Sequence, residues 1–215
     1  RGAYWDVDAD IGAHWRLTRS ATATGFLRIL QANYGTSLDF IQNTGIFTFS
    51  AQVCFVASTG ATQYILDNCT NSAAIPGITV TLDDTTHISI RLSDGTGVSI
   101  VNKQFTLPQA VNYGAWYHIA VTGDGSTLRL YWTAYPGGLG TATLATAQRQ
   151  GSWSAVWLAL GGTGNFPATG ALALGARNDD AASTGANLRV KNRFIGSTGR
   201  DTTALQGRVD FGVLY

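Results

Sequence analysis

The sequence predicts an all-β fold in which two antiparallel sheets pack as a sandwich. Short runs that alternate apolar and polar residues recur along the 215 residues, and turn sequences such as those at 83–84 and 136–138 separate them. Helical periodicity is missing, with at most a short turn at 144–149. Many short strands at this spacing are typical of a two-sheet sandwich. A chain of this length can bury one core, so we expect a single domain over residues 1–215.

The strongest strand signal is a hairpin formed by residues 116–122 and 127–133. Apolar residues alternate along both runs, and the sequence Gly123-Asp124-Gly125-Ser126 between them supplies the residues that a tight turn needs. The other expected strands, in chain order, are 4–11, 26–31, 46–56, 63–68, 77–82, 87–93, 98–101, 155–160, 171–176 and 207–215.

The charge content argues against two classes of partner. Charged residues make up 13% of the chain, against roughly 25% in an average soluble domain, and the net charge is +1. Without a basic run, an electrostatic grip on nucleic acid or on an anionic membrane is not expected. No apolar run reaches the length of about 18 residues that a membrane-spanning helix needs. The sequence has no Met and starts at Arg1, so we expect it to be part of a longer chain.

Cys54 and Cys69 are the only cysteines. If the runs 47–55 and 64–68 form a hairpin that turns near 58–62, the two sulfur atoms lie opposite each other. The chain-entropy model then gives a disulfide worth about 3 kcal/mol, and a disulfide would favour an oxidising, extracellular setting. The alternative is two unpaired, half-buried thiols.

Five segments in order resemble the strands of laminin G-like, or concanavalin A-like, jelly-roll domains. Residues 113–121, Tyr-Gly-Ala-Trp-Tyr-His-Ile-Ala-Val, look like the most recognisable strand of that family, and the remaining four are 47–51, 63–66, 172–175 and 206–215. The resemblance implies a two-sheet antiparallel jelly-roll sandwich, with segment 63–66 paired to the strand at 47–51.

The chain departs from the family pattern after Trp132, where the usual Asp-Gly or Asn-Gly turn is missing, and at 145–170, which is longer than usual. Aromatic residues gather around these departures. Exposed rings can act as apolar platforms for sugars, so the candidate ligand-binding residues are Trp132, Tyr135, Trp153, Trp157 and Phe166. Half-buried anchors of the insertion, or an interface to another chain, are the alternatives for Trp153 and Trp157.

The resemblance also implies one Ca²⁺ at the rim of the sandwich, held by Asp, Asn and backbone carbonyl oxygens. Ca²⁺ is therefore the one candidate cofactor. Each candidate pair has an alternative explanation, since Asp and Asn also bend loops by bonding to their own backbone. The candidate pairs are Asp67 with Asn68, Asp83 with Asp84, and Asp179 with Asp180.

Catalysis is not expected. The β-glucanases of the same superfamily use two glutamates that flank an aspartate on one strand, and retaining hydrolysis needs a nucleophile and an acid close together. This chain has no Glu, and only Asp6, Asp8 and Asp10 show alternating spacing. A solvent-facing strand edge, or a cation site, is the alternative for these three.

We therefore expect a non-catalytic, surface-exposed module for attachment or assembly, located outside a cell, on a cell surface or on a virion. Its partner is a glycan or protein receptor, or identical or other structural subunits, as in a phage decoration or tail protein. A carbohydrate-active enzyme, a hydrolase or lyase of the same superfamily, is the alternative. A glycan-binding module predicts an exposed aromatic groove, whereas a virion component predicts aromatic surface buried against identical chains.

Overall fold

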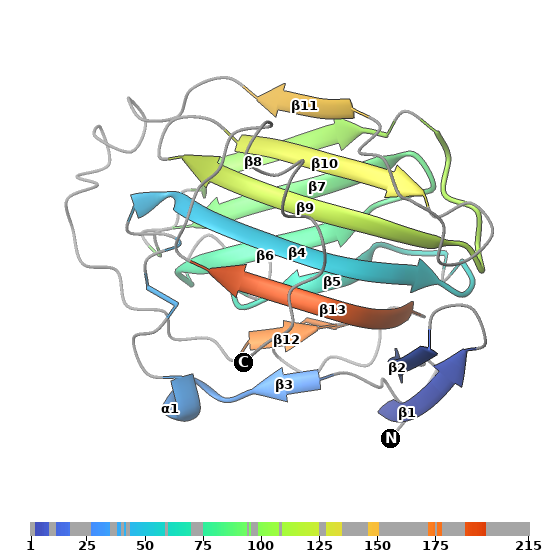
Figure 1. The fold of residues 1–215 in the computed structure, drawn as a ribbon. Coiled ribbons are helices and arrows are strands. Elements are labelled where there is room, and N and C mark those ends of the chain that lie inside the picture. The colour runs from blue at the N-terminus through green and yellow to red at the C-terminus, as the bar shows by residue number, and fades with distance from the viewer. Residues whose placement is uncertain are drawn as a thin grey trace.

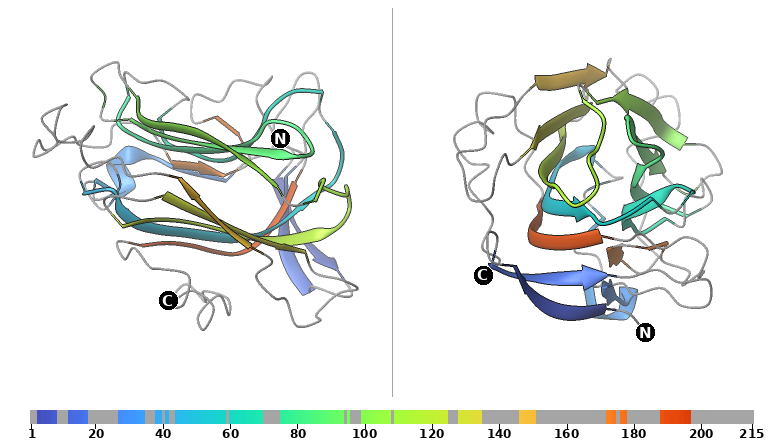
Figure 2. Two further views of the ribbon diagram at one scale, coloured as in Figure 1. Left: turned by 90° about the horizontal axis from the view of Figure 1, so that it is seen from above. Right: turned by 90° about the vertical axis from the view of Figure 1, so that its right-hand side faces the viewer.

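The computed structural model contains two antiparallel sheets that lie face to face (Figure 1). Seen from above, the sheets form two layers (Figure 2), so the predicted two-sheet antiparallel sandwich is confirmed. The structure describes residues 3–8, 12–17, 27–34, 38–39, 41, 44–58, 60–69, 75–93, 95, 99–107, 109–124, 128–134, 146–150, 172–174, 176–177 and 188–196.

The seven-stranded sheet has the order β1-β2-β13-β4-β9-β10-β11. Its strands are β1 (Ala3–Asp8), β2 (Gly12–Leu17), β4 (Ile46–Phe55), β9 (Trp116–Asp124), β10 (Leu128–Ala134), β11 (Thr146–Gln150) and β13 (Leu188–Gly196). The six-stranded sheet has the order β3-β12-β5-β6-β7-β8. Its strands are β3 (Leu27–Ile29), β5 (Gln63–Asp67), β6 (Gly77–Leu82), β7 (His87–Ser93), β8 (Ser99–Thr106) and β12 (Leu172–Leu174). A one-turn helix, α1 (Gln31–Tyr34), follows β3.

The core lies between the two sheets and follows the alternation of the sequence. On β4, every second residue from Phe47 to Phe55 belongs to the core cluster, and β9 contributes Tyr117, Ile119 and Val121 in the same way. Because side chains on a strand point alternately to its two faces, this pattern fixes which face of each strand meets the other sheet.

The predicted hairpin at 116–133 is confirmed. Strand β9 pairs with β10 in antiparallel register, with Val121 opposite Leu130 and Ile119 opposite Trp132. The rings of Tyr117 and Trp132 stack in the core, with centroids 4.4 Å apart and an interplanar angle of 25°.

The predicted hairpin between 47–55 and 64–68 is wrong. Strand β4 pairs with β9 and β13 in the seven-stranded sheet, whereas β5 pairs with β6 and β12 in the other sheet. The short link between β4 and β5 therefore crosses from one sheet to the other.

The predicted disulfide is wrong for the same reason. Cys54 lies on β4 and Cys69 follows β5, so the two residues belong to different sheets, and these buried cysteines form no disulfide with each other. The Sγ atom of Cys69 lies 2.9 Å from the Oγ1 atom of Thr79. Buried thiols in separate layers give no support to an oxidising compartment.

Three strands were not expected. Residues 146–150, expected to form at most a turn, are strand β11, which pairs with β10. Strand β2 pairs with β1, and β13 lies between β2 and β4. The predicted strands 155–160 and 207–215 lie outside the described residues. Within the described parts of the chain, no helix is both long enough and apolar enough to cross a bilayer.

The outward-pointing residues of β4 and β9 are also buried, although many are polar. Gln52, His118 and Thr122 are each no more than 5% exposed. The Nε2 atom of His118 lies 2.8 Å from the Oγ atom of Ser50, on the neighbouring strand. Burial lowers the pKa of His118 to about 4. This face is therefore not an open binding surface.

Candidate functional site

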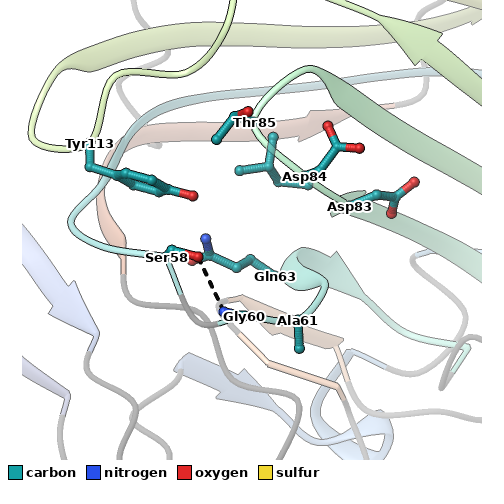
Figure 3. Close-up of a pocket in the computed structure, with 9 residues that line it drawn as sticks. Ser58, Gly60, Ala61, Gln63, Asp83, Asp84, Thr85 and Tyr113 are labelled. Carbon is teal, nitrogen blue, oxygen red and sulfur yellow. Dashed lines mark hydrogen bonds between the residues drawn. The ribbon is translucent and has the colours of Figure 1, made fainter.

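A pocket opens at the rim of the sandwich, where two links between the sheets flank a hairpin turn. The first link joins β4 to β5, the second joins β8 to β9, and the turn between them joins β6 to β7 (Figure 3). The pocket has a volume of about 280 Å³, just below the roughly 300–1,000 Å³ typical of ligand sites. Its lining residues are Ser58, Gly60, Ala61, Gln63, Leu82, Asp83, Asp84, Thr85 and Tyr113.

Backbone hydrogen bonds hold the three pocket segments together. In the link between β8 and β9, the Leu107 amide donates to the Thr86 carbonyl (2.7 Å) and the Val111 amide donates to the Thr85 carbonyl (2.6 Å). The amide of Gly114 donates to the carbonyl of Phe55 at the end of β4 (2.7 Å). The pocket is therefore built from segments that are fixed to each other.

The link between β8 and β9 presents an aromatic ring. Tyr113 is 38% exposed. The next residue, Gly114, has a φ of +87°, a conformation that favours glycine. The backbone amide of Asn112 donates to the buried Tyr117 hydroxyl (2.7 Å). Tyr117 thus anchors the residue next to Tyr113.

Neutral polar groups lie near the Tyr113 ring. The hydroxyl of Tyr113 and the amide of Gln63 both point into the space between the three segments (Figure 3). Gln63 also donates to the carbonyl of Ala57 (3.4 Å), and the Ser58 hydroxyl accepts a bond from the Gly60 amide (3.2 Å). The buried Leu82 is the largest aliphatic residue of the pocket lining. The pocket thus combines an exposed ring with hydrogen-bonding groups.

Two carboxylates lie on the side of the pocket away from Tyr113 (Figure 3). Asp84 accepts bonds from the backbone amide of Thr86 (2.6 Å) and from the Nδ1 atom of His87 (2.8 Å). The Thr86 amide, and after it the side chain of His87, lower the pKa of Asp84 to about 2. Asp84 is therefore ionised at any physiological pH.

Asp83 ties together three strands of the six-stranded sheet. Its Oδ1 atom accepts a bond from Thr81 on β6 (2.9 Å), and its Oδ2 atom accepts bonds from Ser89 on β7 and from Gln104 on β8 (2.8 Å for Gln104). Asp83 and Asp84 therefore both take part in the turn chemistry that was the alternative to a metal site.

Asp67 and Asn68 do not fit a calcium site. Both are fully buried. The Oδ1 atom of Asp67 accepts bonds from the Cys69 amide (3.2 Å) and the Thr79 hydroxyl (2.6 Å), and the Oδ1 atom of Asn68 accepts from the Ile78 amide (2.6 Å). The side-chain atom of Asn68 without a partner is Nδ2, a donor, which cannot ligate a cation.

No group of three or more potential ligand residues occurs within the described ranges. Asp179 and Asp180, the remaining metal candidates, lie outside those ranges.

Of the candidate aromatic residues, the structure describes the side chain of Trp132 alone. It is 3% exposed and packs in the core, so its ring does not face a ligand. Tyr135, Trp153, Trp157 and Phe166 lie outside the described residues.

Sequence comparison identifies the family. Residues 31–173, more than half of the chain, match the Concanavalin A-like lectin/glucanases superfamily of laminin G type. The chain belongs to this superfamily. No curated protein matches the sequence.

Solved structures share the superfamily fold at low sequence identity. The enzymatically active domain of tailspike protein 2 from bacteriophage CBA120 matches with a TM-score of 0.58 and 14% identity, over 92% of this chain and 28% of that chain. The CBM40 of a Ruminococcus gnavus sialidase, bound to α2,3-sialyllactose, matches with a TM-score of 0.54 and 12% identity, over 89% of this chain and 95% of that chain. A Trypanosoma rangeli sialidase matches with a TM-score of 0.50 and 12% identity, over 96% of this chain and 29% of that chain.

This chain therefore spans less than a third of the tailspike and of the T. rangeli sialidase, and corresponds in extent to the carbohydrate-binding module. At these identities the likeness concerns the fold alone.

The sequence analysis missed Tyr113 as a site residue. It placed Tyr113 at the start of a strand-like segment, whereas β9 begins at Trp116 and Tyr113 lies in the turn before it. The adjacent Gly114 was the available signal, because glycine commonly ends an extended run at a turn.

Proposed function

We propose that this superfamily domain is a non-catalytic attachment module whose rim pocket binds a sugar. The observation that carries the proposal is the exposed ring of Tyr113 in a pocket that is also lined by the exposed Ser58 and the half-buried Thr85. Sugars present C–H surfaces that pack on aromatic rings and hydroxyls that need donors and acceptors. The pocket offers both, and its backbone hydrogen bonds hold it in place before a ligand arrives.

The extent of the domain supports the same proposal. The R. gnavus module, which has almost the same length and fold, is bound to a sugar in its solved structure. A module of this kind would act outside a cell, on a cell surface or on a virion, where glycans are displayed.

The carboxylates of the pocket fit binding better than hydrolysis. A glycosidase needs an acid whose pKa is raised so that it can give a proton to the leaving group. The pKa of Asp84 is instead lowered to about 2, and Asp83 accepts bonds from three side chains.

The test of the proposed function is a glycan array followed by titration calorimetry. We expect Tyr113→Ala to weaken binding of the best array ligand by about tenfold or more. Leu30→Ala is the control, because Leu30 is also an exposed apolar side chain, at 50%, but does not line the pocket. Binding that is absent from the whole array, or that Tyr113→Ala leaves unchanged, would refute a sugar site in this pocket.

The enzyme alternative has its own test, which is incubation with β-glucan and alginate and detection of reducing ends or unsaturated products. We expect no turnover. Turnover that is lost on changing Asp8 or Asp10 to Asn would instead establish a carbohydrate-active enzyme.

A second candidate function is assembly within a virion, which the fold likeness to the phage tailspike favours. This candidate predicts a defined oligomer held by aromatic surface. Light scattering that finds a monomer up to high concentration would exclude self-assembly.

A further inference from the structure

The residues that line the rim pocket carry negative charge only. Among the nine residues that line it, Asp83 and Asp84 are acidic, and none is a lysine or arginine. His87 contacts Asp84 but does not itself line the pocket. A ligand in the pocket therefore meets negative charge without a facing Lys or Arg among the lining residues.

The negative charge at Asp84 is exposed and present at physiological pH. The Asp84 side chain is 54% exposed, and the Thr86 amide and His87 keep its pKa near 2. Asp83, at the neighbouring position, accepts bonds from hydroxyl and amide groups, which orient its carboxylate. Both groups can accept hydrogen bonds from hydroxyl or ammonium groups, but they repel an anion.

Asp83 and Asp84 both line the pocket, so a bound sugar would lie within range of their negative charge. Tyr113 lies on one side and the two aspartates lie on the other, with their carboxylate groups turned away from the Tyr113 ring (Figure 3). In a pocket of about 280 Å³ a sugar ring seated on Tyr113 would direct its far edge toward the aspartates. Specificity in such a site comes from repulsion of the wrong ligand as well as attraction of the right one.

Resting on the proposed sugar site, we infer that this pocket selects uncharged or amino-bearing sugars and rejects acidic sugars such as sialic and uronic acids. This selectivity is the opposite of that expected from the R. gnavus module, which is bound to a sialylated sugar.

The test uses an array that displays neutral oligosaccharides beside the sialylated forms of the same oligosaccharides, with chitosan oligomers as amino-bearing probes. We expect the neutral or amino-bearing probe to bind at least about tenfold more tightly than its sialylated counterpart at low salt. Raising the ionic strength should narrow this difference, because salt screens exposed charges.

Asp84→Asn tests the contribution of the negative charge separately from that of the turn structure. The asparagine oxygen can still accept the Thr86 amide bond, so the turn is retained while the negative charge is lost. The matched control is Asn33→Lys, which makes the same change in net charge at an exposed position of α1, at the opposite end of the sandwich from the end of β4 (Figures 1 and 2). We expect Asp84→Asn, and not Asn33→Lys, to reduce the discrimination severalfold.

The outcomes separate the two proposals. If sialylated probes bind as well as neutral ones, and Tyr113→Ala abolishes both, the sugar site stands and the selectivity inferred here is wrong. Discrimination that Asp84→Asn leaves unchanged also overturns the inference. If no probe binds above the Tyr113→Ala background, the sugar site itself is refuted, and the inference with it.

Discussion

The hydroxyl of Tyr117 lies in the core, yet we predict that it controls the pocket. Tyr117→Phe removes one atom and keeps the ring that stacks on Trp132. The lost group accepts the bond from the backbone amide of Asn112, the residue next to Tyr113 (2.7 Å). The substitution therefore tests whether a buried group positions the exposed ring.

The expected cost in stability is small. A hydrogen bond of this kind contributes about 1 kcal/mol net, and the exposed position of Asn112 lets water replace part of the loss. A loss of about 1 kcal/mol corresponds to roughly 2–4 °C in Tm for a domain of this size. For comparison, Trp132→Ala removes a whole core ring and should cost about 3–5 kcal/mol.

The effect on sugar affinity should be of about the same size as the effect on stability. Leu107, Val111 and Gly114 still hold the link by their own backbone bonds, so the link should shift rather than unfold. A shift at Asn112 moves the neighbouring ring, and we expect sugar affinity to fall by about three- to tenfold, or roughly 1 kcal/mol.

The assay combines urea denaturation, sugar titration and amide hydrogen exchange at Asn112. Tyr113→Phe is the control for stability and for hydrogen exchange, because its hydroxyl belongs to an exposed ring and its loss should change stability by less than about 0.5 kcal/mol. Faster exchange at Asn112 in Tyr117→Phe alone would support the anchoring role. Unchanged exchange together with unchanged stability would refute it.

Three further predictions follow from buried and candidate residues. Burial lowers the pKa of His118 from 6.5 to about 4, so between these pH values the unfolded chain binds a proton that the folded chain does not. The free energy of unfolding should therefore fall by about 3 kcal/mol as the pH drops from 6.5 to 4. In urea melts, His118→Gln should show a smaller dependence of the free energy of unfolding on pH over this range. Cys54 and Cys69 should react with a thiol reagent only after denaturation and without prior reduction, and an oxidised pair found by mass spectrometry would contradict the structure. If the segment 132–166 carries a partner interface, Trp153→Ala and Trp157→Ala should each cost roughly 2 kcal/mol of binding with little loss of stability, whereas loss of stability with intact assembly and glycan binding would assign both rings to packing.

The sequence predicted correctly those elements that form between residues close together in the chain. The hairpin of β9 and β10 could be predicted because its turn and both alternating runs are adjacent in the chain. Asp83 and Asp84 were likewise predicted to form a turn, and they do.

Pairing between strands that are far apart in the chain was not predicted correctly from the sequence. A short loop between β4 and β5 resembled a hairpin, but the partners of β4 are β9 and β13, far away in the chain. Strand β13 was missed because its register shifts between Lys191 and Phe194, which breaks the alternation that identifies a strand. The pocket could not be predicted either, because its segments are far apart in the sequence. It forms only where both sheet-crossing links meet the turn at 83–86.

Because two sheet-crossing links form part of the pocket, the pocket exists only while the two sheets stay packed together. Two of its three segments join one layer to the other, and the third is a turn of the six-stranded sheet, so separating the layers destroys the pocket. A ligand that binds only the intact pocket must then oppose that separation, by about 2.7 kcal/mol at a free concentration 100-fold above its Kd. On a surface dense in its sugar, an attached domain would be harder to unfold and to digest than the same domain in solution. Binding to the surface would thereby slow the unfolding and proteolysis of the bound module.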